Sequence, residues 1–388
     1  MNEQLVEFLL SDAAEDAIAA ELKASESKPL ARLARWKDQF GLDESRALAD
    51  LLDARTRLSG RHSLGAQWFA RAAVAKQASS ELTATWRARR FPKGERVADL
   101  CAGAGVDSVA LAKNHEVIAV DSHWVSAAFV RANLKRHCEG SHYVVAGRVP
   151  QVAPRVRFCF ADPDRRVDGR RVVDPQHAAP SLSELLDSEC GDEGLGVKLS
   201  PMVKTSDLDE EGELEFISVG GELKEVVLWT GALKEACRRV SLPSSGFVLD
   251  GEPILVQEIG TVGDILYVPD PALVRSGLLG QVAEEQGLWG LEKDVAYLSG
   301  SEIMPHPLLK PYRVLGEFPN RARDIKRFLR ERGLGRLTAS RRRFAESPDG
   351  FLSRLGRIKG DGVAHLHLTH CLGEARVFVT EPPKPDGR

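Results

Sequence analysis

Residues 97–121, VADLCAGAGVDSVALAKNHEVIAVD, decide the fold that this sequence predicts. An apolar run ends at Asp99, and a tight loop that contains Gly103 and Gly105 follows it. A helical stretch comes next, and a second apolar run ends at Asp121. A strand, a glycine turn, a helix and a strand that ends in an acid form a βαβ unit, which predicts a parallel sheet with right-handed crossovers.

Glycine turns of this kind hold adenosine-containing cofactors at the carboxyl edge of a sheet, and the residues around the turn indicate which cofactor is bound. A dinucleotide site favours G-x-G-x-x-G/A, with the pyrophosphate at the helix N-terminus. Here Ser108 takes the third small position, and the carboxylate of Asp107 would repel a pyrophosphate but suit a methionyl amine. The pattern D-x-x-x-G-x-G, from Asp99 to Gly105, resembles the first motif of class I S-adenosylmethionine-dependent methyltransferases.

The resemblance implies how a cofactor would be held. In that family the acid of the first strand and the glycine loop hold the methionyl end, and the acid after the second strand holds the ribose hydroxyls. The corresponding residues are Asp99, Cys101, Gly103, Gly105, Asp107, Asp121 and Ser122. Cys101 is interpreted as a small packing residue, because a nucleophile would need a His or Lys partner. The structural alternative is an ordinary turn that uses glycine for its positive φ.

The composition of the chain excludes some classes of protein but does not identify the function. With 388 residues, two or three domains are expected, and a formal net charge of −3 argues neither for nor against nucleic acid. No apolar run reaches the length of a membrane span, and the acidic N-terminus lacks the basic start of a secretory signal. The six cysteines are scattered, which predicts reduced thiols in a cytoplasmic protein. The ten histidines lack H-E-x-x-H and H-x-x-x-H spacing, which predicts no metal site.

The first two regions of the chain differ in pattern. Residues 1–92 carry apolar side chains at helical spacing, and the basic stretches 55–61 and 87–90 favour a solvated helical cap over a substrate arm. Residues 93–250 alternate strands and helices, which predicts an α/β domain with a Rossmann-like sheet. The expected elements are strands 97–100, 116–120, 143–146, 156–161 and 196–199, helices 106–112 and 125–136, and edge strands 213–219 and 237–242, which could close the sheet in antiparallel fashion.

Residues 251–380 mix short strands and helices, which predicts a small α+β domain. A strand is expected at 254–258. A helix is expected at 271–286, with Asp270 as its cap and a proline at its first position. The final residues, 381–388, are expected to be a disordered tail.

A polar motif, Asp162-Pro-Asp-Arg-Arg, follows the fourth strand and is expected at the carboxyl edge beside the cofactor. In methyltransferases that act on base nitrogens the counterpart is (D/N/S)-P-P-(Y/F/W), whose acid or amide accepts the amine hydrogens, which is positioning rather than acid–base chemistry. Here Asp164 replaces the second proline and Arg165 the aromatic residue, and a guanidinium can stack on a base or clamp a phosphate. Lys198 ends the fifth strand at the same edge, so we predict Asp162, Arg165 and Lys198 as catalytic residues. The alternative is a Pro-Asp turn with solvated arginines.

Basic residues concentrate in 321–343, RARDIKRFLRERGLGRLTASRRR. Arg323, Lys326, Arg327 and Arg330 share one helical face at three- and four-residue spacing. Such a face predicts binding to RNA phosphates, and the alternative is a solvated helix.

Taken together, the chain resembles bacterial class I methyltransferases with a C-terminal THUMP-like domain. The stretches that carry this resemblance are QAS at 77–79, DLCAGAGVDSVALA, VIAVD, ADPDRRVDGRR, GVKLSPM, ELEFISVGGELKEVVLW, YVPDPALVRSGLL and GRLTASRRR. The resemblance implies S-adenosylmethionine as cofactor, tRNA or rRNA as partner, and methylation of a base nitrogen. A non-catalytic RNA-binding protein with a degenerate cofactor fold is one rival, supported by Asp164 and by Gly147 where an acid often contacts adenine. A methyltransferase that acts on a protein or small molecule is another.

Overall fold

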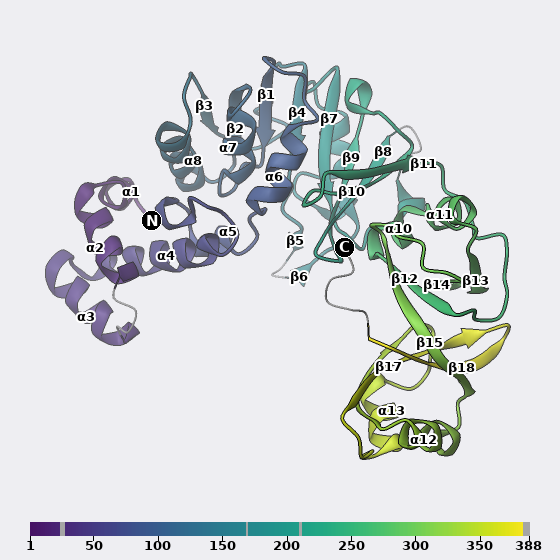
Figure 1. The fold of residues 1–388 in the computed structure, drawn as a ribbon. Helices are drawn as coiled ribbons and strands as arrows, with labels where there is room; N and C mark the ends of the chain where they lie inside the picture. Colours follow the sequence, from purple (N-terminus) through teal and green to yellow (C-terminus); the bar gives the residue numbers. More distant parts are fainter. Residues whose placement is uncertain (24–27, 168–169, 209–211, 383–388) are drawn as a thin grey trace. The chain divides into compact units, whose positions relative to one another are not determined.

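The computed structural model describes residues 1–23, 28–167, 170–208 and 212–382, and the chain forms two compact units (Figure 1). Unit 1 comprises Met1–Glu213 and Glu225–Glu235, and unit 2 comprises Leu214–Lys224 and Ala236–Arg388. The domain boundaries at 92 and 250 follow sequence pattern rather than compactness, and they stay predictions. Most of the predicted tail lies outside the described residues.

Unit 1 begins with helices, as the apolar spacing predicts. They are α1 (Glu3–Leu9), α2 (Asp12–Lys23), α3 (Pro29–Phe40), α4 (Leu42–Ser59), the 3-10 turn η1 (Gly65–Gln67), α5 (Ala72–Ala75) and α6 (Glu81–Ala88). Helix α4 packs against α1, α2, α3 and α5. Val6, Leu9, Leu48 and Leu51 share a buried apolar cluster with Phe129 of helix α8 (Trp124–His137). The N-terminal helices therefore pack against the α/β region of the same unit.

Arg55 and Arg87 of this region are buried, whereas Arg57, Arg61 and Arg89 are exposed, so the predicted solvated cap is correct only in part. Arg55 is 2 % exposed, and its Nη1 donates a hydrogen bond to Glu15 Oε2 at 3.0 Å. Arg87 is also 2 % exposed, and the Arg90 side chain pairs with Glu213. Each buried guanidinium has an acidic partner, as buried charges require, but these partners come from distant parts of the sequence.

The centre of unit 1 is a mixed sheet that is mostly parallel. Its elements are β1 (Arg96–Leu100), α7 (Val106–Ala112), β2 (Glu116–Asp121), α8, β3 (Tyr143–Ala146), β4 (Phe158–Ala161), β7 (Gly194–Leu199) and β9 (Glu222–Trp229). The strand order is β9-β7-β4-β1-β2-β3, with parallel pairing except where β9 meets β7 (Figure 1). Helix α7 packs on β1 and β2, and α8 packs on β2 and β3. The carboxyl ends of β1, β2, β4 and β7 therefore meet at one edge.

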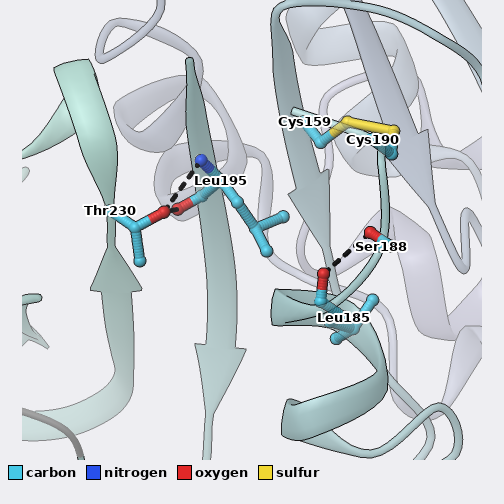
Figure 2. The surroundings of a disulfide bond; sticks show 6 residues. All are labelled: Cys159, Leu185, Ser188, Cys190, Leu195 and Thr230. Carbon is cyan, nitrogen blue, oxygen red and sulfur yellow. Dashed lines mark hydrogen bonds between the residues drawn. A yellow bond between two sulfur atoms is a disulfide. The ribbon is translucent and has the colours of Figure 1, made fainter. Parts of the chain in front are cut away.

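Two of the six cysteines form a disulfide, which corrects the prediction that all are reduced. Cys159 of β4 is bonded to Cys190, which precedes β7 (Figure 2). They come together because β4 and β7 are neighbours, with Cys159 beside Leu195 in register. The segment between them carries β5 (Arg166–Val167), β6 (Arg170–Arg171), η2 (Pro175–His177) and α9 (Leu182–Leu186). Two short turns, η3 (Thr205–Asp207) and η4 (Gly231–Leu233), complete unit 1.

Unit 2 contains two sets of strands. In the first, β8 (Glu213–Val219) is parallel to β10 (Arg238–Leu242), and β10 is antiparallel to β11 (Phe247–Gly251). The second is a sheet in the order β13-β14-β12-β15-β18-β17-β16. Its elements are β12 (Ile265–Pro269), α10 (Pro271–Ser276), α11 (Leu279–Gln286), β13 (Trp289–Glu292), β14 (Val295–Gly300), β15 (Leu309–Pro319), α12 (Ala322–Glu331), β16 (Leu334–Arg341), α13 (Pro348–Leu355), β17 (Gly362–Cys371) and β18 (Glu374–Thr380).

Two predictions for unit 2 are wrong in detail. The helix expected at 271–286 is two helices, because Gly277 adopts a left-handed φ of 83° and ends α10. The strand expected at 254–258 is absent from the structure of those residues, and Leu255 is 70 % exposed. The α+β character of the region is as predicted, and α12 and α13 pack together on β16.

Two expectations concern membranes and metals. In the described part of the chain, no helix combines the length and apolar character needed to cross a bilayer. The same residues contain no group of three or more His, Cys, Asp and Glu side chains placed to hold a metal ion. The cytoplasmic location stays a prediction.

Candidate active site

The loop between β1 and α7 uses backbone conformations that favour small residues. Gly103 has a φ of 58° and Gly105 a φ of 76°, both left-handed. A Cβ on Gly105 would lie 3.1 Å from Val130 of α8, so space also favours glycine there. Cys101 has a φ of 66°, which is uncommon for a residue with a side chain and is typical of functional sites. The result is a compact turn at the carboxyl end of β1.

Asp121 ends β2 beside this turn. Its Oδ2 accepts a hydrogen bond from the Gly103 backbone N–H at 2.8 Å, and its Oδ1 accepts one from the His123 N–H at 2.8 Å. Burial raises the pKa of Asp121, although both backbone donors oppose the shift. Ser122, the next residue, is exposed. Asp121 and Ser122 therefore lie where hydroxyl groups of a ribose could be held at the carboxyl edge.

Asp99 lies beneath the turn rather than at its surface. It is 1 % exposed, and its carboxyl group accepts a hydrogen bond from the Ser108 hydroxyl. Burial, with the nearby carboxylates of Asp107 and Asp162, holds the pKa of Asp99 well above its usual range. Asp99 thus links the end of β1 to α7 through Ser108. Its direct contact with a cofactor stays a prediction.

Asp107 is also buried, and its carboxylate has partners within the protein. Its Oδ2 accepts a hydrogen bond from Ser79 Oγ at 3.0 Å, and its Oδ1 pairs with Arg87. Burial acts to raise the pKa of Asp107, but the positive charges of Arg87 and Lys198 outweigh burial and lower it. Asp107 is therefore an anion held by protein cations, and the predicted contact with a methionyl amine is not tested.

Carboxylates surround Cys101 in the turn. Burial raises the pKa of the Cys101 thiol, and the charges of Asp121, Asp162, Asp99 and Asp164 raise it further. The thiol stays protonated, which agrees with its interpretation as a packing residue. The carboxyl groups of Asp121 and Asp162 near this turn also favour a ligand that carries positive charge, as the sulfonium and amine of S-adenosylmethionine do. The residues present thus fit a cationic adenosyl cofactor.

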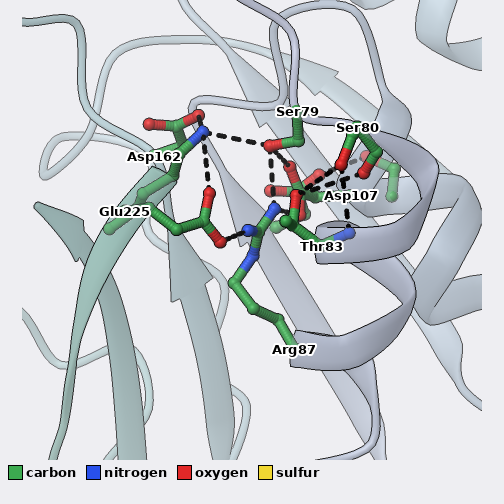
Figure 3. A network of polar contacts seen from close by, with 10 residues as sticks. Ser79, Ser80, Thr83, Arg87, Asp107, Asp162 and Glu225 are labelled. Atoms are coloured by element: carbon green, nitrogen blue, oxygen red, sulfur yellow. Dashed lines mark hydrogen bonds and ion pairs between the residues drawn. The ribbon is translucent and has the colours of Figure 1, made fainter. Parts of the chain in front are cut away.

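The structure brings Asp162 and Lys198 together at the carboxyl ends of β4 and β7. Lys198 Nζ lies 2.7 Å from Asp162 Oδ2 and 3.9 Å from Glu225 Oε2, and Lys198 is 6 % exposed. The Asp162 backbone N–H donates to Leu100 O at 3.3 Å, which places this acid beside the cofactor loop. Figure 3 shows the second carboxylate oxygen of Asp162 pointing away from the polar network. That oxygen is placed to accept a hydrogen bond from a ligand.

The two residues that depart from the usual motif, Asp164 and Arg165, lie between β4 and β5. Asp164 is exposed, and its backbone pairs with that of Ala179 through hydrogen bonds of 3.1 and 2.9 Å. Arg165 is half-buried. The contact of Arg165 with a substrate stays a prediction.

A buried polar network joins the predicted residues to three that sequence reasoning missed: Ser79, Arg87 and Glu225 (Figure 3). Arg87 pairs with both Asp107 and Glu225. In the sequence, Ser79 could have been found from its place in the QAS stretch. Arg87 could have been found because it shares one side of a helix with the small residues Thr83, Ala84 and Ala88. These four residues are all buried on α6.

The N-terminal helical region also supports the cofactor loop. Trp68 is fully buried, and its Nε1 donates to Ala104 O at 2.6 Å. Asn133 Nδ2 donates to the same carbonyl at 3.3 Å. A Cβ on Gly103 would lie 3.4 Å from Val74, which belongs to α5. Residues 68–87 are therefore part of the site's framework.

The predicted RNA-binding residues lie on α12 in unit 2. Arg323, Arg327 and Arg330 are exposed, and Lys326 is partly buried. Ile325 and Leu329, on the opposite side of the helix, are fully buried. This amphipathic pattern presents cations to solvent, as the spacing predicts.

Replacing Asp121 with alanine is expected to weaken S-adenosylmethionine binding by about 1.5–3 kcal/mol, or roughly 10- to 150-fold, because hydrogen bonds to a charged acceptor are lost. Isothermal titration calorimetry measures this directly. Asp187→Ala, which alters an exposed residue at the end of α9, is the control and should bind as the unaltered protein does. Equal affinities for the Asp121 and Asp187 variants would place the ribose elsewhere.

Comparisons with known proteins identify the family. No family model matches the chain. An uncharacterized S-adenosylmethionine-dependent methyltransferase of Mycobacterium tuberculosis H37Rv is 30 % identical over 331 residues, which cover 82 % of this chain and 90 % of that protein. Its counterpart in strain CDC 1551 gives the same values. A crystal structure of a candidate methyltransferase from Porphyromonas gingivalis W83 covers 99 % of both chains, with a TM-score of 0.79 at 19 % identity.

These similarities agree with the geometry. The structural likeness shows an α/β fold of the class I methyltransferase type, and the sequence likeness extends over both units. The chain belongs to the S-adenosylmethionine-dependent methyltransferases, and S-adenosylmethionine is its cofactor.

Proposed function

We propose that this methyltransferase modifies RNA at a base nitrogen and that unit 2 contributes a THUMP-like RNA-binding domain. The observation that carries the proposal is the second carboxylate oxygen of Asp162, which points away from the polar network in Figure 3, while Lys198 Nζ lies 2.7 Å from the first. A carboxylate in that place accepts N–H donors, and amines of nucleobases are such donors. The exposed cations of α12 support a polyanionic partner.

The residues of the site would position the acceptor. The bound cofactor supplies an electrophilic methyl group. Asp162 would accept an N–H of the base amine, which turns the nitrogen lone pair toward the methyl carbon. Once the nitrogen has accepted the methyl group, Asp162 would take the surplus amine proton and pass it to solvent. Lys198, whose Nζ lies 2.7 Å from Asp162 Oδ2, would hold that carboxylate in orientation, and Arg165 would stack on the base or hold its phosphate.

The rivals are separated by one experiment. We expect nucleosides from total RNA of a deletion strain, analysed by mass spectrometry beside the parent strain, to lack one methylated species. The membership of the chain in a methyltransferase family disfavours the rival of a non-catalytic RNA-binding protein. An unchanged nucleoside profile, with methyl transfer found on a protein or small molecule instead, would contradict the RNA proposal.

Removing the α12 cations is expected to weaken RNA binding without slowing bound turnover. The triple change Arg323→Ala, Arg327→Ala, Arg330→Ala should raise KM and flatten the salt dependence of affinity by roughly one unit of slope for each lost phosphate contact. The partner of Arg327 is Asp324 at 3.8 Å, an exposed pair that contributes little to stability. Filter binding across salt concentrations measures the slope.

The control is Lys293→Ala, an exposed cation in the turn between β13 and β14. It changes net charge without touching α12, so its salt slope should stay near that of the unaltered protein. If the unaltered protein, the triple variant and Lys293→Ala show the same salt dependence of RNA affinity, the cations of α12 are only solvated and do not bind RNA.

A further inference from the structure

The hydroxyl of Ser79 lies at the centre of the buried network. Its oxygen donates to Asp107 Oδ2 at 3.0 Å and accepts from Arg87 Nη2 at 2.8 Å and from Lys198 Nζ at 3.0 Å (Figure 3). A hydroxyl has one donor and two acceptor sites, so all three are used. Ser79 is 6 % exposed, and no smaller residue could replace these three contacts.

These contacts link two parts of the site. Asp107 lies in the first turn of α7, directly after the cofactor loop. Lys198 ends β7 and holds Asp162, the acid of the acceptor side. Ser79 itself precedes α6, far from both in sequence. In a low-dielectric interior, such hydrogen bonds are strong and their geometry is well defined.

We propose that Ser79 is a positioning residue for methyl transfer, because its hydroxyl fixes the Lys198 ammonium, which in turn orients Asp162 toward the acceptor. The inference rests on the proposed role of Asp162 and deepens it. The same hydroxyl ties Asp107 to Lys198, so the cofactor loop and the acceptor acid keep a constant separation. No proton or electron passes through Ser79; its effect is geometric.

Ser79→Ala is expected to lower kcat about tenfold and to leave S-adenosylmethionine affinity within about twofold. Of the three hydrogen bonds lost, the one to Lys198 acts on Asp162, and a tenfold loss corresponds to about 1.4 kcal/mol, the size of one such bond. The assay measures methyl incorporation from labelled S-adenosylmethionine into total RNA of the deletion strain. In an Asp162→Asn background, Ser79→Ala should cause no further loss of kcat, because both changes disturb the same Ser79–Lys198–Asp162 contacts.

The matched control is Ser80→Ala. Ser80 caps α6 by accepting from the Thr83 N–H at 3.2 Å, so its loss destabilises the same helix by about 1 kcal/mol. We expect Ser80→Ala to lower the melting temperature but to leave kcat unchanged. If both serine variants lose rate in proportion to their loss of stability, or if Ser79→Ala keeps full kcat, Ser79 is only structural and the proposal is overturned.

A measurement without RNA keeps this outcome separate from the RNA proposal. Lys198 should acetylate slowly with acetic anhydride, because Asp162 and Ser79 hold its ammonium group. Ser79→Ala should increase that labelling severalfold, measured by peptide mass spectrometry, whereas Ser80→Ala should not. Absence of RNA methylation by the unaltered protein would contradict the function, and unchanged Lys198 labelling would contradict the role of Ser79.

Discussion

Replacing Arg87 with alanine is expected to lower the free energy of unfolding by about 3–5 kcal/mol, the cost of removing one partner from a buried ion pair. Arg87 is 2 % exposed and pairs with Asp107 and Glu225, and its guanidinium lies 5.1 Å from the ring centre of Phe160. Without it, two buried carboxylates lose their main cation. Urea denaturation followed by circular dichroism measures the difference.

The pH dependence of this loss has a defined sign. The charges of Arg87 and Lys198 outweigh burial and lower the pKa of Asp107 in the folded protein. A lowered pKa stabilises the fold above the ordinary aspartate range and stops doing so as pH falls through the folded value. The difference in unfolding free energy between the unaltered protein and Arg87→Ala should therefore be full at neutral pH and should narrow as pH falls through the lowered pKa of Asp107.

The control for Arg87 is Arg57→Ala. Arg57 pairs with Asp53 on the exposed face of α4 at 3.0 Å, and such pairs contribute about 0.3–0.5 kcal/mol. If Arg87→Ala costs no more than Arg57→Ala, the buried network does not hold unit 1 together.

Asp162→Ala is expected to reduce kcat about 100-fold while RNA affinity stays nearly the same, because misplacing an acceptor by a small distance costs about that much. In the unaltered protein Lys198 Nζ also lies 3.0 Å from Ser79 Oγ and 3.9 Å from Glu225 Oε2, and because these partners remain, the variant should still fold. Single-turnover methylation and filter binding separate the two quantities.

Asp164→Ala is the matched control for Asp162. It removes an exposed carboxylate two residues away, whose backbone pairing with Ala179 does not need the side chain. Turnover should be close to that of the unaltered protein. Full turnover in the Asp162 variant would move the acceptor site elsewhere.

Local pattern was sufficient for the central elements of the fold. The helix expected at 106–112 is α7, which follows the glycine turn, and the strand expected at 143–146 is β3, a run of apolar residues. Strand β9 was missed, since its first residues, Glu222 and Lys224, are charged and exposed and its apolar half begins later. The break at Gly277 was missed because a lone glycine is also tolerated within helices.

The site could be predicted only where its residues follow strands in order. Asp162 directly follows β4 and Lys198 is the penultimate residue of β7, so topology alone indicates that they meet. Ser79, Arg87 and Glu225 could not be found in this way, because their contacts are set by packing between segments far apart in sequence. Arg87 and Glu225 are 138 residues apart.

The packing of residues 68–87 against the cofactor loop bears on where a minimal catalytic fragment can begin. A fragment starting at residue 93, where the strand-and-helix pattern begins, would lack Trp68, Ser79 and Arg87. The carbonyl of Ala104 would lose its 2.6 Å donor. The helical segment and the sheet of unit 1 therefore depend on each other structurally. A chimeric protein that takes the sheet from a relative should take the helical segment from the same relative.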